Sequence, residues 1–219
     1  NMTKFKICGI RDVYHAIVAA DAGADFLGFV FVEGVRRQLQ VDEAEKLIND
    51  YRSREKDGEP ALVGLFANQS AKFINSVIKK CGLDYVQLCG DETSGFWPTV
   101  DARVIRQVKV MDSLPRAEAV TDAVRKVELA ISRGHMAVLD KHESGLLGGT
   151  GNTFDWTLAW EIAREYPVLL AGGLTPENVA SAIETASPWG VDVSTGVEID
   201  GAKDADRINA FAREVRASN

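Results

Sequence analysis

The chain alternates short apolar runs with segments of helical periodicity along its whole length. Continuous apolar runs rich in β-branched and aromatic residues are typical of buried strands, and apolar residues three and four apart are typical of amphipathic helices. Strands are predicted over residues 4–8, 26–31, 61–66, 84–88, 103–108, 136–140, 167–171 and 190–193. Helices are predicted over 12–22, 41–54, 70–81, 118–133, 154–165, 176–186 and 203–217, and a weaker one within 92–101, where Gly95 and Pro98 interrupt the pattern.

Three residues carry helix-capping chemistry. Asp12, Ser70 and Thr175 each precede a helical segment and have side-chain oxygens that accept hydrogen bonds from a first helical turn. Pro176 follows Thr175 at the favoured first helical position. These residues are therefore predicted to mark helix starts.

Eight strand–helix units predict an α/β fold with a single (β/α)₈ barrel over residues 1–219, its parallel strands surrounded by helices. About 27 residues per unit is near the lower end for this fold. A doubly wound open sheet is the main alternative, but it usually has a Gly-rich turn after its first strand, and here Gly9 stands alone. Two domains are less favoured because no Pro- or Ser-rich linker divides the chain. We expect Asn1, before Met2, to be an addition to the natural chain.

Composition limits the partners that the chain can have. With 46% apolar and 26% charged residues it resembles an ordinary globular protein, and its net charge of -7 argues against nucleic-acid binding. No apolar stretch approaches the ~20 residues of a membrane span, and no signal-peptide pattern is present, so we expect a cytoplasmic protein. Three cysteines without CxxC spacing indicate reduced thiols, with neither a disulfide framework nor a zinc site.

Glycines cluster after the seventh and eighth predicted strands. In barrels these two loops form the usual phosphate site, because glycines let backbone N–H groups wrap an anion. The alternative, that the glycines only make tight turns, is weakened by two such loops in adjacent positions. A further cluster at residues 148–151 could add donors or act as a lid. We expect a phosphate monoester to bind Gly172, Gly173, Leu174, Ser194, Thr195 and Gly196.

Cys8 and Asp140 end the first and sixth predicted strands, where a parallel α/β protein places its chemistry. The alternative for Cys8 is that of a small buried hydrophobe, and for Asp140 that of a cap. However, an aspartate that closes an apolar run must be paired or face a cavity. Cys81 is expected to be inert at a helix end, and Cys89 to line the pocket without reacting.

Two other carboxylates stand near strand ends and compete with Asp140. Asp192 is interpreted as structural, because a negative charge beside Ser194 and Thr195 would repel a phosphate. Glu198 follows the same loop. Asp140 remains the better candidate acid.

The order of seven motifs resembles the phosphoribosylanthranilate isomerase family of tryptophan biosynthesis over nearly the whole chain. The resemblance implies a (β/α)₈ barrel without a cofactor that performs an Amadori rearrangement on N-(5-phosphoribosyl)anthranilate. It matches the family's general base to Cys8 and its general acid to Asp140. The motifs are K-I-C-G-I at 6–10, A-D-A-G-A-D-F-L-G-F-V-F at 20–31, V-G-L-F at 63–66, D-Y-V-Q-L at 84–88, G-G-T-G-N-T-F-D-W at 148–156, A-G-G-L-T-P-E-N-V at 171–179 and D-V-S-T-G-V-E at 192–198.

The chain departs from the family pattern at two places. The family usually has Ser-Pro-Arg where this chain has Val35-Arg36-Arg37, so the arginine that faces the anthranilate falls on Arg37, with Arg36 as a rival. After the V-Q-L motif, which contains the expected substrate-binding residue Gln87, Cys89 replaces the usual histidine. The implied partner is a phosphosugar, bound by a monomer or a homodimer.

The implied chemistry sets demands on both catalytic groups. A cysteine is only a few per cent thiolate at neutral pH, so Cys8 needs a positive charge such as Lys6, Arg36 or Arg37. Asp140 must have a raised pKa to donate a proton, with desolvation under residues 141–151 as the expected cause; His142 is an alternative acid. The rival functions are a different phosphosugar barrel enzyme, many of which place a lysine or metal ligands at strand ends, and a non-catalytic phosphosugar-binding barrel.

Overall fold

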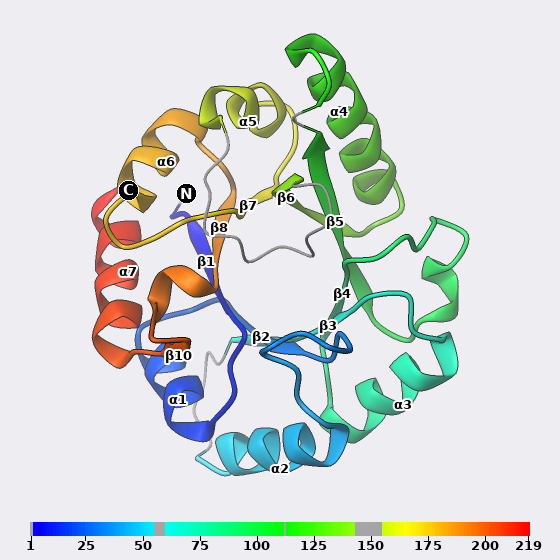
Figure 1. Cartoon of the computed structure of the whole chain (residues 1–219), viewed down its shortest axis with the longest axis vertical. Helices are drawn as coiled ribbons and strands as arrows, with labels where there is room; N and C mark the ends of the chain where they lie inside the picture. Colours follow the sequence, from blue (N-terminus) through cyan, green and yellow to red (C-terminus); the bar gives the residue numbers. More distant parts are fainter. Residues whose placement is uncertain (1, 55–59, 112, 143–154) are drawn as a thin grey trace.

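The computed structural model describes residues 2–54, 60–111, 113–142 and 155–219. Within these residues, eight parallel strands close into a barrel in the order β1 to β8, with β8 pairing back onto β1 (Figure 1). This confirms the predicted barrel. The strands are β1 (Lys4–Cys8), β2 (Phe26–Val30), β3 (Ala61–Phe66), β4 (Tyr85–Leu88), β5 (Arg103–Met111), β6 (Met136–His142), β7 (Leu169–Leu170) and β8 (Gly190–Val193).

Helices surround the barrel and follow the predicted segments, with one exception. The weak segment within 92–101 forms only a 3₁₀ turn, η1 (Trp97–Thr99), because Gly95 and Pro98 leave too short a stretch for an α-helix. In the described residues the α-helices are α1 (Val13–Asp21), α2 (Val41–Arg52), α3 (Ala71–Cys81), α4 (Arg116–Ser132), α5 (Trp156–Ala163), α6 (Val179–Ala186) and α7 (Ala205–Ala217).

Two of the three predicted caps are confirmed. Asp12 and Ser70 accept hydrogen bonds from backbone N–H groups in the first turns of α1 and α3. The prediction for Thr175 was wrong, because α6 begins only at Val179. Asn178 holds the preceding turn closed: its Oδ1 accepts from the Thr175 N–H at 2.8 Å, and its Nδ2 donates to the Gly173 carbonyl at 3.0 Å.

The core has two shells, because successive side chains of a strand point to opposite faces of the sheet. The outer shell packs between the strands and the helices and includes Ile7, Leu27 and Val191. The inner shell fills the barrel axis and includes Phe26, Val63, Leu65, Ile105, Met136, Val138 and Leu169. Burial on both faces explains why the strands read as continuous apolar runs.

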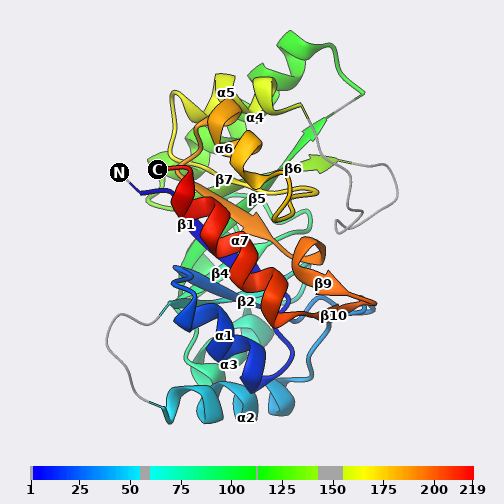
Figure 2. The ribbon, with the colours of Figure 1, turned by 90° about the vertical axis from the view of Figure 1, so that its left-hand side faces the viewer.

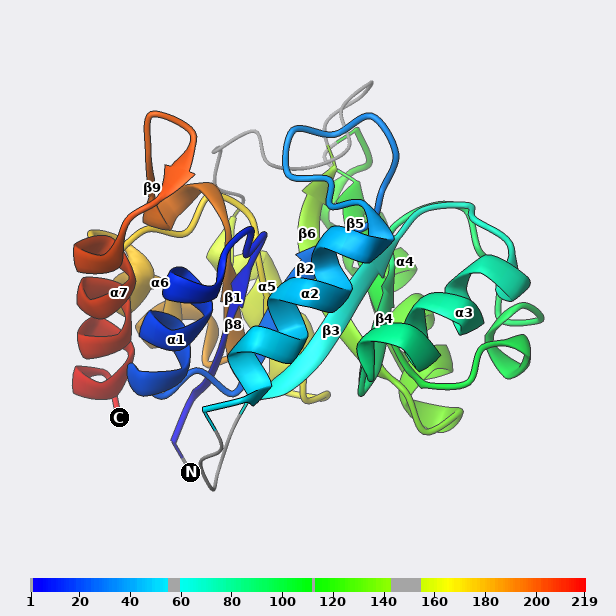
Figure 3. The ribbon, with the colours of Figure 1, turned by 90° about the horizontal axis from the view of Figure 1, so that it is seen from below.

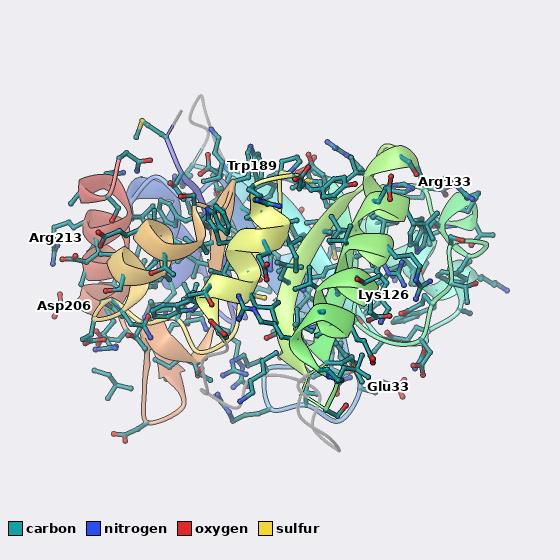
Figure 4. All side chains as sticks on the ribbon, turned by 90° about the horizontal axis from the view of Figure 1, so that it is seen from above. Glu33, Lys126, Arg133, Trp189, Asp206 and Arg213 are labelled. Carbon is teal, nitrogen blue, oxygen red and sulfur yellow. The ribbon has the colours of Figure 1, made fainter. Side chains whose placement is uncertain are left out.

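The two ends of the barrel differ. The loops that follow the strands lie at one end, and both chain termini lie at the other (Figure 3). Figure 4 shows the same polarity: Glu33, after β2, and Trp189, before β8, are at opposite ends. A small antiparallel hairpin, β9 (Glu198–Ile199) and β10 (Ala202–Lys203), was not predicted and projects beside the loop end (Figure 2). No helix in the described residues is long and apolar enough to cross a membrane.

Candidate active site

A cavity of about 360 Å³ opens at the carboxyl ends of the strands. This size is in the range of small-molecule sites. The cavity brings together residues from every part of the barrel wall, so side chains far apart in sequence face one space. Of the predicted site residues it is lined by Cys8, Arg37, Gln87, Asp140, Gly172, Gly173, Leu174, Ser194 and Thr195.

Cys8 ends β1 and is only 6% exposed, although its side chain forms part of the cavity wall. Gly28 on the neighbouring β2 leaves room for it, because a Cβ at Gly28 would lie 2.7 Å from the Cys8 Sγ. Burial raises the pKa of the Cys8 thiol, while the positive charges of Lys6 and Lys203 act to lower it. Lys6 therefore lowers the pKa of Cys8 as expected, but burial raises that pKa by more.

Asp140 lies on β6, which β7 and β8 separate from β1 around the barrel. Burial raises the pKa of Asp140 to about 6, in the direction that an acid near neutral pH requires. Its Oδ1 accepts from the Lys141 N–H at 2.8 Å and its Oδ2 from the Gln107 Nε2 at 3.0 Å. These bonds favour the carboxylate, so burial prevails over them. The side chain of His142 lies outside the described residues, as do residues 143–154.

Asp192, interpreted from sequence as structural, is buried inside the barrel and lines the cavity. Its Oδ2 is 3.0 Å from the Nζ of Lys6. The ion pair neutralises the carboxylate locally, which removes much of its expected repulsion of a bound phosphate.

Four charged side chains form a cluster at one side of the cavity, here called the Glu198 cluster: Arg36, Arg37, Glu198 and Lys203. Arg37 donates from Nε and Nη2, Arg36 from Nη2, and Lys203 from Nζ, all to the Glu198 carboxylate at 2.7 to 2.8 Å. Burial alone would raise the pKa of Glu198, but these hydrogen bonds outweigh it and lower the pKa to about 2. Three cations share one carboxylate, so the cluster has excess positive charge.

Both arginines line the cavity, but they are placed differently. The Arg37 side chain is 15% exposed and its stem crosses Gly9, where an added Cβ would lie 2.5 Å from the Arg37 Cδ. The Arg36 side chain is 45% exposed and also donates to the Gly201 carbonyl of the β9–β10 hairpin. Arg37 is therefore the more closely held of the two and lies next to the residue after Cys8.

The loops after β7 and β8 form another side of the cavity. Gly172 and Gly173 both have positive φ, at 95° and 68°, a conformation that glycine adopts without strain. Their backbone N–H groups donate to no other described residue and are available to a ligand. The loop is held from behind by Asn178, as described above.

Gly196 is not among the residues that line the cavity, and its contact with phosphate stays a prediction. Its Cα packs against the Leu174 carbonyl, and a Cβ there would collide with that oxygen. Arg207 of α7 donates to the Gly196 carbonyl at 2.9 Å and pairs with Glu177 in the other loop. Gly196 thus joins the two loops. The glycines at 148–151 lie outside the described residues.

Cys89 lines the cavity as predicted, and burial raises the pKa of its thiol to about 12. Cys81 is buried at the end of α3, far from the cavity wall. Sequence reasoning missed Gln107, Gly28 and Lys203. Gln107 could have been predicted, since it is a polar residue within an apolar strand that pairs with the strand of Asp140.

In the described parts of the chain, no three His, Cys, Asp or Glu side chains are grouped so that they could hold a metal ion.

Comparison with known proteins identifies the family of the chain. A family model described as N-(5'phosphoribosyl)anthranilate (PRA) isomerase matches residues 5–214. The chain belongs to this family. The N-(5'-phosphoribosyl)anthranilate isomerase of Dehalococcoides mccartyi is 40% identical over 220 residues, covering 98% of this chain and 96% of the relative. That of Roseiflexus castenholzii is 41% identical over 216 residues, covering 97% and 98%.

Solved structures of the family agree with the fold. The phosphoribosyl anthranilate isomerase of Thermotoga maritima superimposes with a TM-score of 0.83 at 30% identity, covering 99% of this chain and 100% of the other. A phosphoribosyl anthranilate isomerase in complex with reduced 1-(o-carboxyphenylamino)-1-deoxyribulose 5-phosphate gives a TM-score of 0.80 at 30% identity with the same coverage.

Proposed function

We propose that this chain is a phosphoribosylanthranilate isomerase of tryptophan biosynthesis. The reaction is the Amadori rearrangement of N-(5-phosphoribosyl)anthranilate to 1-(2-carboxyphenylamino)-1-deoxyribulose 5-phosphate. One observation carries the proposal: a single cavity contains a thiol, a carboxyl group whose pKa is raised to about 6, arginines and two glycine-containing loops. Each of these features meets one demand of the substrate.

The reaction needs an acid and a base on opposite sides of the sugar. In its protonated form, Asp140 donates to the furanose ring oxygen and opens the ring to a Schiff base. The Cys8 thiolate then removes the C2′ proton, which gives an enamine that tautomerises to the ketone. With a pKa of about 6, roughly a tenth of Asp140 is protonated at pH 7.

The two ends of the substrate carry negative charge and require different partners. We propose that the phosphate binds the backbone N–H groups of Gly172, Gly173 and the Ser194–Thr195 segment, which suit an anion. The anthranilate carboxylate binds Arg37, whose guanidinium supplies charge-assisted hydrogen bonds. Excess positive charge in the Glu198 cluster favours a carboxylate at this side of the cavity.

The rival functions have less support. Lys6 lies on a barrel strand, as in other phosphosugar barrel enzymes, but it is completely buried and does not line the cavity. A non-catalytic binding barrel would have no need for a proton donor with a pKa near 6 in the same cavity as a thiol. We also propose that the chain acts as one domain in the cytoplasm without a cofactor, as a monomer or a homodimer; the Thermotoga maritima relative is described as dimeric.

A steady-state fluorescence assay on N-(5-phosphoribosyl)anthranilate tests the function. The purified chain is expected to consume the fluorescent substrate, and product formation is confirmed by chromatography. An Asp140→Asn/Cys8→Ser variant serves as the control for background decay of the substrate. A folded chain that binds the reduced product analogue but does not exceed this control would be a binding barrel and would overturn the proposal.

A further inference from the structure

A lysine lies completely buried inside the barrel beneath Cys8. Lys6 precedes Cys8 by two residues on β1, and alternate side chains of a strand share a face, so both point into the barrel. The Lys6 side chain is 0% exposed, and its Nζ is 3.0 Å from Oδ2 of Asp192. The two residues are register partners across β1 and β8. Lys6 is therefore held at a defined depth below the cavity.

A contribution to folding stability does not explain the buried Lys6–Asp192 ion pair. Removing two charges from water is costly, and apolar residues of the same volume often stabilise a core as well or better. The second carboxylate oxygen of Asp192, Oδ1, is also buried without a hydrogen-bond donor among the described residues, which adds to the cost. A role in the chemistry of the site explains why charged groups occupy these positions.

The charges around Cys8 identify that role. Burial raises the pKa of the thiol; Lys6 is the charge that lowers it most, Lys203 of β10 lowers it further, and Asp192 acts in the opposite direction. The neighbouring thiol of Cys89 stays neutral, since burial raises its pKa to about 12. Burial disfavours a charged Lys6, but Asp192 and the Cys8 thiolate together more than compensate, so the pKa of Lys6 is raised and the lysine stays protonated.

We propose that Lys6 is a positioning residue whose ammonium charge stabilises the anionic sulfur of Cys8, with Asp192 as the counter-ion that keeps Lys6 charged and in place. Lys6 does not line the cavity, so it acts on the substrate only through Cys8. During turnover the thiolate takes the C2′ proton and becomes a thiol, while Lys6 keeps all its protons. This inference rests on the proposed function, in which Cys8 is the base.

Alkylation of Cys8 measures the effect without turnover. Rates of modification by iodoacetamide are followed against pH on the substrate-free full chain, with Cys8 resolved by mass spectrometry. Lys6→Met is expected to move the pH midpoint of Cys8 alkylation upward by about one unit or more, which lowers the rate at pH 7 about tenfold. Because Lys6→Met leaves a buried unpaired carboxylate, Lys6→Met/Asp192→Asn provides a second variant without either charge, and the same direction is expected.

Lys4→Met is the matched control. Lys4 lies on the same face of β1, two residues before Lys6, but pairs with Asp25 at 3.5 Å near the surface. This variant is expected to leave the Cys8 midpoint unchanged. If the double variant folds and its midpoint equals that of the wild type, Lys6 is structural and the inference is overturned.

The pH profile of turnover separates this inference from the proposed function. The productive form needs protonated Asp140 and the Cys8 thiolate, and the pKa of Cys8 lies above that of Asp140, so the base sets the high-pH limb of kcat/KM. In the double variant this base limb is expected to move upward by the same amount as the alkylation midpoint, with kcat lowered and KM little changed. A wild-type chain without isomerase activity would overturn the proposed function. An active wild type whose base limb does not move in the double variant would overturn the role of Lys6 alone.

Discussion

Arg37 and Glu198 form a two-bond ion pair, from Nε to Oε2 and from Nη2 to Oε1, each 2.8 Å long. They lie 161 residues apart, one in the loop after β2 and the other at the start of the β9–β10 hairpin. The pair fixes the plane of the guanidinium at the cavity wall. A side chain held in this way loses little further freedom when it binds a carboxylate.

Arg37→Ala is expected to raise KM with little change in kcat, because the bond to the substrate carboxylate is present in both the ground and transition states. The loss corresponds to about 1.5–3 kcal/mol, or roughly 10- to 150-fold in KM. Arg36→Ala is the matched control and is expected to do little. The reverse order in steady-state KM values would assign the carboxylate to Arg36.

Cys8→Ser should lower kcat by about 10²–10⁴-fold while leaving the fold and phosphate binding intact, because a hydroxyl is a far poorer base than a thiolate. Cys81→Ser, at a buried position distant from the cavity, is expected to be nearly silent in kinetics. Retention of more than about a tenth of the wild-type kcat in Cys8→Ser would remove Cys8 from the base role.

Asp140→Asn should lose kcat with little change in affinity, since the amide cannot supply the proton. In the wild type, kcat/KM is expected to rise with pH up to about 6 and then to level off, because above that pH the loss of protonated Asp140 is offset by the gain in Cys8 thiolate. This break near pH 6 should disappear in the variant, whose residual activity should keep rising with pH. A loss confined to KM would instead mark Asp140 as a binding residue and favour His142 as the acid.

The same variant should be more stable than the wild type at neutral pH. The folded-state pKa of Asp140 is raised from 3.8 to about 6, so the folded protein binds more protons than the unfolded chain between these values and loses stability as pH rises through them. Removing the charge is expected to gain up to about 3 kcal/mol at pH 7 and almost nothing at pH 4. Urea denaturation at both pH values measures the difference, and an equal gain at both would contradict the electrostatic cause.

Gly28→Ala tests how closely β2 packs against the base. The added Cβ would lie 2.7 Å from the Cys8 Sγ, so the sulfur must move and kcat is expected to fall at least tenfold with a smaller effect on KM. Gly95→Ala is the control, because its Cβ would meet only the Thr93 Oγ1 at 3.7 Å. Equal kinetics for the two variants would show that Cys8 tolerates displacement.

Local patterns predicted much of the architecture. Strand and helix periodicity depends on neighbouring residues, and it located all eight strands and seven helices of the described chain. Strand ends of a parallel barrel meet at one face, so Cys8 and Asp140 were predictable as cavity residues. The predictions that were wrong concern boundaries: a 3₁₀ turn replaces the helix within 92–101, and α6 starts after Asn178 instead of after Thr175.

The ion pairs and pKa values of the site depend on closure of the barrel, and no local sequence pattern predicts them. Lys6 meets Asp192 only because β8 pairs with β1 in one register, and Glu198 collects Arg36, Arg37 and Lys203 only because the β9–β10 hairpin lies beside the loop after β2. The close packing of Gly196 against the Leu174 carbonyl also depends on how the loops after β7 and β8 meet. Ion pairs and close backbone contacts between residues far apart in sequence depend on the relative placement of whole strands, and the pKa of each group follows from that placement and from burial.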